Sequence, residues 1–205
     1  VGVSVVNALS EKLQLEISRD GKKFFIEFKN GDTKSPLKAI GKSKETGTQI
    51  TFLPSKEVFS SIKFSASILI KRLRELAFLN RGIKIIFIDA TSKREKVEEF
   101  KFDGGVVEFV EFLDEKRERL KNKNDNDLFR KPIQIEGKNK GIEIECALKW
   151  NASYAEDVLP YTNNIYQKDG GTHLLGFRSA LTRVINKYAN EHNLLKRNKL
   201  TISGD

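Results

Sequence analysis

Two runs of alternating apolar and polar residues meet at Asp20-Gly21 in the stretch LQLEISRDGKKFFIEFKNGD. Alternation with a period of two is typical of strands, and an Asp-Gly between such runs favours a two-residue hairpin turn. Asn30-Gly31-Asp32 marks a second turn at the end of the second run. This part of the chain is therefore predicted to form an antiparallel hairpin.

The remaining patterns combine further strands with separate helices. The stretch TGTQITFLP predicts a strand that Pro54 ends. From Ser65, helical spacing replaces alternation in ASILIKRLRELAFLN. Further predicted elements are a short helix over 4–10, paired strands in IKIIFID and KVEEFKF, a helix in VVEFVEFLDEKRER, a hairpin around KNKG and a long helix after DGGTHLLGFR. Strand runs followed by segregated helices predict an α+β fold rather than a doubly wound parallel sheet.

Residues 114–127, DEKRERLKNKNDND, contain one apolar residue and no aromatic residue. This composition is typical of a linker or an exposed loop between domains. The alternative is a polar helix end followed by an ordinary loop.

Composition restricts the classes of protein that the chain can represent. Its net charge is +9, from 37 basic and 28 acidic residues, which suits either a polyanion-binding surface or a solvated face. The most one-sided charge lies near the C-terminus, in Arg178, Arg183, Lys187, Lys196, Arg197 and Lys199, against Glu191 alone. The single cysteine, Cys146, is expected to be a buried, inert thiol. No apolar run is long enough to span a bilayer, and the lack of any methionine suggests a piece of a longer polypeptide.

The stretch DGGTHLLGFR, residues 169–178, looks like an active site but matches no template for one. A P-loop needs Gly-Lys-Ser/Thr at the start of the helix, and this stretch has Gly-Thr-His. The spacing of its glycines also differs from the dinucleotide fingerprint. Thr172 and His173 are adjacent, so they point in different directions at the start of a helix. We expect the glycines to form a turn and Thr172 to cap the helix.

Two other stretches allow either a binding role or a structural one. In Val1-Gly2-Val3-Ser4, a glycine precedes a helix and leaves N–H groups free for an anion, but it also suits a simple turn. In Thr46-Gly47-Thr48, hydroxyls at the start of a strand can bind a ligand or satisfy local backbone groups. No cluster of metal ligands or paired catalytic carboxylates is apparent in the sequence.

A family resemblance extends over essentially the whole chain. In order, VGVSVVNALS, TGTQITFLPS, IKRLRELAFLNRGIKI, YTNNIYQKDGGTHLLGFRSALTR and LTISGD resemble the B subunits of bacterial DNA gyrase. The corresponding subunit of topoisomerase IV is the second resemblance, because the YTNNI and FRSALTR blocks are closer to gyrase. A basic, non-enzymatic α+β nucleic-acid-binding module remains the alternative from the residues alone.

The resemblance implies two domain fragments. Residues 1–120 would be the C-terminal portion of an ATPase domain of the GHKL (Bergerat) type. Residues 121–205 would be the N-terminal portion of a transducer domain similar to the ribosomal S5 domain 2-like fold. The polar stretch 114–127 falls on that boundary.

The resemblance also implies roles for particular residues. Val1, Gly2 and Val3 match the end of a glycine-rich lid over the phosphates of ATP, Thr48 matches the threonine of the adenine pocket, and Ile50 matches an apolar residue lining that pocket. Arg19 matches the arginine that contacts aminocoumarin inhibitors. Arg178, Arg183 and Lys187 would face DNA.

In the family, the catalytic glutamate, the Mg²⁺-binding asparagine and the adenine-binding aspartate all precede the position of Val1. The γ-phosphate-sensing lysine follows that of Asp205. We therefore expect no catalytic residue in these 205 residues and no ATP hydrolysis by them alone. The partners implied are double-stranded DNA, the gyrase A subunit in an A2B2 heterotetramer, and a second gyrase B chain in an ATP-dependent dimer, all in the cytoplasm at the nucleoid.

Overall fold

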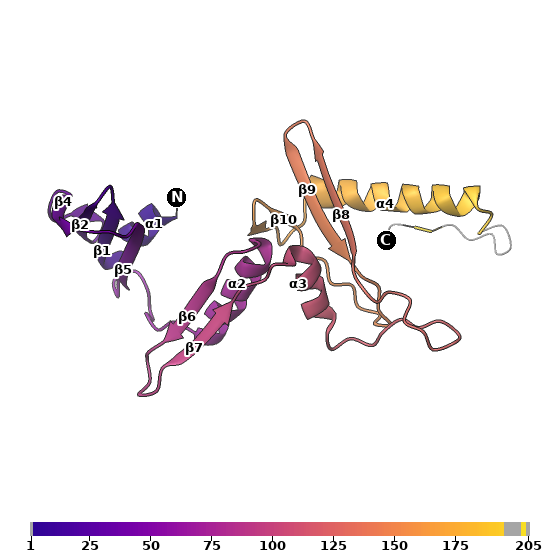
Figure 1. Cartoon of the computed structure of the whole chain (residues 1–205), viewed down its shortest axis with the longest axis horizontal. Coiled ribbons are helices and arrows are strands. Elements are labelled where there is room, and N and C mark those ends of the chain that lie inside the picture. Colours follow the sequence, from indigo (N-terminus) through magenta and orange to yellow (C-terminus); the bar gives the residue numbers. More distant parts are fainter. Residues whose placement is uncertain (1, 195–201, 204–205) are drawn as a thin grey trace. The chain divides into compact units, whose positions relative to one another are not determined.

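The computed structural model describes residues 2–194 and 202–203. The chain divides into two compact units, Val1–Ala66 and Ser67–Asp205, whose elements are labelled in Figure 1. Helices and antiparallel strands occur in both units, so the structure confirms the predicted α+β class. The division at residue 66 differs from the domain boundary that the sequence predicts near residue 120, and that boundary stays a prediction.

Unit 1 is built on one antiparallel sheet. Its elements are α1 (Val3–Ala8), β1 (Ser10–Arg19), β2 (Lys22–Lys29), β3 (Asp32–Thr33), β4 (Lys38–Lys42) and β5 (Gly47–Pro54). The central strand β1 pairs with β2 on one side and β5 on the other, and the far edge of β2 pairs with β3 and β4. The predicted turn at Asp20-Gly21 is confirmed: the φ angles of 53° and 75° are those that a two-residue hairpin loop requires.

The ladder places most apolar residues of the three longest strands on one face, with Phe25 and Leu53 on the other. Leu13, Leu15 and Ile17 of β1 lie opposite Phe28, Ile26 and Phe24 of β2. Directly opposed residues of an antiparallel pair share a face. Leu13 is 2% exposed, and helix α1 packs on β1 and β5.

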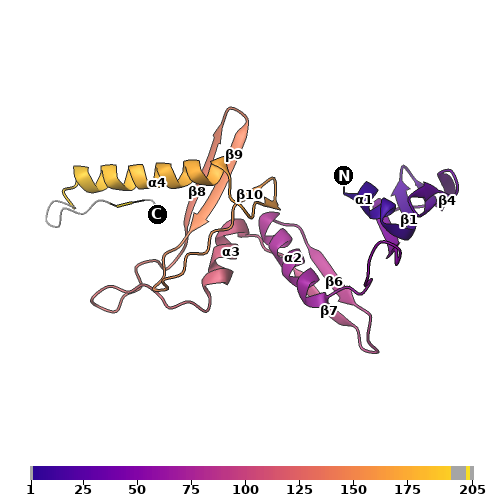
Figure 2. The ribbon, with the colours of Figure 1, turned by 180° about the vertical axis from the view of Figure 1, so that it is seen from behind.

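Unit 2 contains the remaining elements. They are α2 (Ala66–Leu79), β6 (Ile85–Asp89), β7 (Lys96–Phe100), α3 (Gly105–Asp114), β8 (Ile133–Asn139), β9 (Ile142–Leu148), β10 (Tyr161–Thr162), β11 (Ile165–Tyr166) and α4 (Thr172–Glu191). The β6–β7 hairpin runs beside α2 in the views of Figures 1 and 2. Arg74 of α2 forms an ion pair with Glu98 of β7 at 3.6 Å. The predicted pairs β6–β7 and β8–β9 are confirmed.

The core of unit 2 is a cluster of phenylalanine rings around Phe78 of α2. Phe78 is 1% exposed. The centroid of its ring lies 3.7 Å from the ring centroid of Phe102, 4.8 Å from that of Phe109 and 5.5 Å from that of Phe112. These contacts pack α3 against α2. Helix α3 also packs on β9, so the helices before residue 120 share unit 2 with the hairpin after it.

Candidate functional site

Gly2 is the N-cap of α1 and has a backbone conformation that favours glycine, with φ 78° and ψ −117°. Its carbonyl oxygen accepts N–H bonds from Val5 and Val6 at 3.0 and 3.1 Å. The preceding N–H groups of the first turn have no acceptor within the helix, and this turn carries no acidic residue. With six residues, α1 has a weak dipole, so an anion here would be held mainly by N–H groups. Val1 lies outside the described residues.

Thr48 and Ile50 lie on β5 and share its apolar face. Thr48 is opposite Ile17, and Ile50 is opposite Leu15. Thr48 is exposed, and 40% of Ile50 is exposed. The structure therefore brings a hydroxyl and an incompletely covered apolar surface together, which suits a planar ligand with a polar edge.

Arg19 is the last residue of β1. It follows Ile17 by two positions and so occupies the same face, diagonal to Thr48 on β5. Its guanidinium lies 3.5 Å from the carboxylate of Asp20, and both side chains are more than three-quarters exposed. Arg19 and Thr48 therefore lie at one end of the apolar face.

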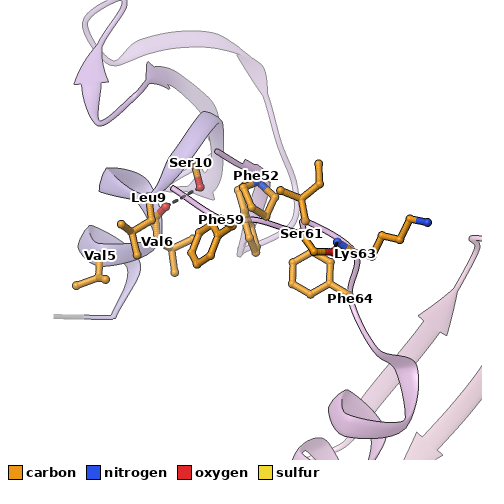
Figure 3. A pocket seen from close by; sticks show the side chains of 11 residues that line it. Val5, Val6, Leu9, Ser10, Phe52, Phe59, Ser61, Lys63 and Phe64 are labelled. Atoms are coloured by element: carbon orange, nitrogen blue, oxygen red, sulfur yellow. Dashed lines mark hydrogen bonds between the residues drawn. The ribbon is translucent and has the colours of Figure 1, made fainter. Parts of the chain in front are cut away.

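Neither of two cavities formed by described residues of unit 1 holds all the predicted residues. A polar cavity of about 230 Å³ beside the start of β5 includes Thr48, Gly47, Glu16 and Lys23. An apolar cavity of about 220 Å³ lies between α1, the end of β5 and the segment after it (Figure 3). The apolar cavity is lined by Val5, Val6, Leu9, Ser10, Phe52, Pro54, Phe59, Ser61, Ile62, Lys63 and Phe64. Among the residues that the structure describes, Thr48 is thus the one predicted site residue that lines either cavity.

The predicted cap at Thr172 is wrong. Helix α4 starts at Thr172, and Gly171 is its N-cap, with φ 155° and ψ 177° and no side-chain hydrogen bond to the cap. A Cβ atom at Gly171 would lie 2.9 Å from the imidazole of His173. The glycine therefore leaves room for His173, and the turn is made by the backbone without the threonine hydroxyl.

The positive charge of α4 is less one-sided than the sequence suggests. Arg178 donates to both carboxylate oxygens of Glu156 at 2.9 Å. Lys187 lies 3.8 Å from Glu191, and both of these side chains are largely exposed. The nearest opposite charge to Arg178 therefore comes from a loop outside the helix. Lys196, Arg197 and Lys199 lie outside the described residues.

Sequence reasoning missed a set of polar contacts that bridge residues 114–127. We call these the junction contacts: Asp114–Lys149, Arg117–Asp157, Tyr161–Glu75 and Arg81–Glu145. Each joins a residue before the predicted linker, or at its start, to one after it. The most enclosed is Asp114–Lys149, at 2.6 Å with side chains 7% and 12% exposed. No local sequence signal identifies these pairs, because the partners lie far apart in the chain, 86 positions in the case of Tyr161 and Glu75.

The junction contacts shift two pKa values. Burial raises the pKa of the Asp114 carboxyl, but the hydrogen bonds from Lys149 and Asn151 outweigh it, so the pKa is lower than usual. Burial, together with the bond to Glu75, raises the pKa of the Tyr161 hydroxyl. Elsewhere, Cys146 is half-buried and not fully buried as predicted, and this burial raises the pKa of its thiol.

Within residues 2–194 and 202–203, no group of three or more His, Cys, Asp or Glu side chains could hold a metal ion. No helix in that part of the chain combines the length and apolar character needed to cross a membrane.

A family model described as DNA gyrase B matches residues 105–205. Over the full chain, the sequence is 47% identical to the DNA gyrase B chain of Chlamydia pneumoniae, 42% to that of Streptococcus pyogenes serotype M3 and 44% to that of Rickettsia prowazekii. The chain spans 25 to 30% of the length of these relatives.

The fold is also similar to a solved structure. A crystal structure of the 43K ATPase domain of Thermus thermophilus gyrase B, in complex with an aminocoumarin, matches with a TM-score of 0.77 at 38% identity. The match covers 94% of this chain and 50% of that one.

Proposed function

The chain belongs to the DNA gyrase B family, and we propose that the whole protein is the ATPase subunit of a type II DNA topoisomerase. It couples ATP binding and hydrolysis to the passage of one DNA duplex through another and so introduces negative supercoils. The observation that carries this proposal is 47% identity to a gyrase B chain along the full length of this one. The similarity to a gyrase B ATPase domain supports the ATP-dependent part.

The proposed domains are those that the sequence predicts. Residues 1–120 form the C-terminal portion of a GHKL ATPase domain, and residues 121–205 form the N-terminal portion of an S5 domain 2-like transducer domain. Support comes from the family model, which covers the C-terminal half of the chain alone. The junction contacts would then join the two domains.

The proposed nucleotide contacts lie in unit 1. ATP would supply the γ-phosphoryl group, and Mg²⁺ held by ligands outside these residues would neutralise the charge of its phosphates. The N–H groups around Val1, Gly2 and Val3 bind phosphate oxygens, which the left-handed backbone at Gly2 supports. Thr48 bonds the adenine through its exposed hydroxyl, and Ile50 covers one face of the base. Arg19, diagonal to Thr48, contacts an aminocoumarin.

The catalytic glutamate and the Mg²⁺ ligand belong to parts of the protein outside these 205 residues. The residues present therefore bind and orient the nucleotide and do not accept a proton from the attacking water. The conformational change that closes the lid around Gly2 is transmitted to the transducer helix α4. Arg178, Arg183 and Lys187 of that helix face DNA, with Arg178 partly neutralised by Glu156.

The proposed assembly pairs two copies of this protein with two gyrase A subunits, which carry the DNA-cleaving tyrosines. The two gyrase B chains dimerise when ATP binds. The assembly works in the cytoplasm at the nucleoid.

The test is a supercoiling assay with the full-length protein and its A subunit. Relaxed plasmid should become negatively supercoiled when ATP is present and should stay relaxed without it or with novobiocin. The double variant Arg183→Glu and Lys187→Glu should lose DNA-stimulated ATPase activity while keeping its basal rate, because charge reversal opposes phosphate contacts. No supercoiling by the wild-type assembly would contradict the proposed function, and unchanged stimulation in the variant would contradict the role of α4.

A further inference from the structure

Three cationic side chains stand in one line across unit 1. Arg19 of β1 lies directly opposite Lys22 of β2, and Lys22 lies directly opposite Lys42 of β4. Directly opposed residues share a face, so all three side chains lie on the same side of the sheet, at its turn end. We call Arg19, Lys22 and Lys42 the cationic row.

Within the described residues, the row has little neutralising charge. Arg19 has an ion pair with Asp20 at 3.5 Å, and both side chains are highly exposed. Lys22 and Lys42 are exposed and form no ion pair among these residues. Like charges directly opposite each other destabilise a sheet, so the row is unfavourable for the free protein.

On the opposite face of the same sheet, where Lys12 lies directly opposite Lys29, two lysines have acidic partners. There, Lys23 pairs with Glu16, and Lys12 pairs with Glu27 at 3.3 Å. Each of these lysines therefore has an acidic partner on the neighbouring strand. Lys22 and Lys42 have no such partner among the described residues, so their charges are free to bind an anion outside the sheet.

The geometry of the row points to the chemistry of that anion. Three strands at a spacing of about 4.8 Å place the charges along a line of about 10 Å. A single small anion would contact one end of such a line, whereas an extended polyanion can contact all of it. Flexible lysine side chains bind backbone phosphates without reading base sequence.

We propose that the cationic row binds the phosphate backbone of duplex DNA, as a contact of unit 1 separate from the DNA-facing residues of α4. The choice of DNA over another polyanion rests on the proposed function, since duplex DNA is the substrate of that reaction. Neutralisation by phosphates removes the repulsion between Arg19, Lys22 and Lys42 when DNA binds.

The test measures binding of a short fluorescein-labelled duplex to the full-length protein, by anisotropy over a series of salt concentrations without nucleotide. The variants are Lys22→Gln, Lys42→Gln and their combination. Each single change should reduce the slope of log K against log salt by about 0.9 and weaken binding about eightfold near 0.1 M salt. The matched control is Lys56→Gln, which removes an exposed lysine of unit 1 that lies outside the row.

Hydrogen exchange of β1 and β2 provides the second readout. Because the substitutions relieve repulsion, exchange in these strands should be unchanged or slower while DNA affinity falls. Wild-type slopes in the double variant would overturn the proposal, as would an equal loss in Lys56→Gln or faster exchange that accompanies the loss. So would stronger competition by polyglutamate than by unlabelled duplex, which would identify an acidic protein as the partner.

The same assays separate this inference from the proposed function. The wild-type protein could supercoil DNA while the Lys22→Gln and Lys42→Gln variants bind duplex DNA with wild-type affinity. In that case the inference fails and the proposed function stands. If the wild-type protein neither binds duplex nor supports supercoiling, the proposed function fails, and the DNA contact fails with it.

Discussion

At the scale of single residues, Gly105 has the closest contacts to an added side chain among the glycines that the structure describes. Its φ is +60°, and a Cβ atom there would overlap the Arg81 side chain, lying 2.8 Å from its Cγ. Gly105→Ala should therefore lower the free energy of unfolding by about 2 kcal/mol, through backbone strain and displacement of Arg81. Urea denaturation measures this change. Gly137→Ala is the control, because no atom lies within 4 Å of its Cβ position, and an equal loss there would contradict the explanation.

At the scale of elements, the small β10–β11 hairpin is held to α2 by Tyr161 and Glu75. The pKa of Tyr161 is raised in the folded state, so this group stabilises the fold fully below its unfolded pKa of about 10. Above that pH only the unfolded state loses the proton, and the stabilisation is lost. Between about pH 9 and 11, stability should fall more steeply in the wild type than in Tyr161→Phe. Equal pH dependence of stability in the wild type and Tyr161→Phe would contradict this. So would an equally shallow pH dependence in the control Tyr154→Phe, which changes an exposed tyrosine.

At the scale of the whole molecule, the buried pair Asp114–Lys149 joins residues on both sides of the predicted domain boundary. Asp114→Asn leaves Lys149 charged and enclosed, so the loss should be about 3 kcal/mol. Adding Lys149→Gln removes that charge, and the double variant should be more stable than Asp114→Asn alone. A double-mutant cycle by urea denaturation measures the coupling. Additive losses would show that the two groups do not interact.

The sequence predicts those elements of the fold that their own residues determine, and it does not predict those that depend on residues far away in the chain. The turn at Asp20-Gly21 was predictable because its residues themselves favour positive φ. Strand β4 was missed because KAIGK has no alternation, and all five residues are exposed at the edge of β2. Helix α3 ends at Asp114, earlier than its pattern predicts, where that carboxylate bonds to the distant Lys149 and Asn151.

In the candidate site, too, some features could be predicted from local sequence and others depend on the fold. The positions of Gly2, Thr48 and Arg19 follow from local patterns read through the family resemblance, and the structure adds that Thr48 and Arg19 share one face. The local capping rule gave the wrong residue at Thr172, because Thr172 is already the first residue of α4 and Gly171 is the N-cap. The cationic row could not be read from the sequence, since it depends on the register between β2 and β4.

The junction contacts also decide where this region can be divided into smaller soluble pieces. A fragment cut near residue 120, at the polar stretch, would separate Asp114 from Lys149 and Glu75 from Tyr161, exposing surfaces that pack together in the intact chain. A cut near residue 66 follows the division between the compact units and keeps every one of these pairs on the same polypeptide. For crystallisation or NMR of the region after unit 1, the start of α2 is thus a better first residue than the apparent linker.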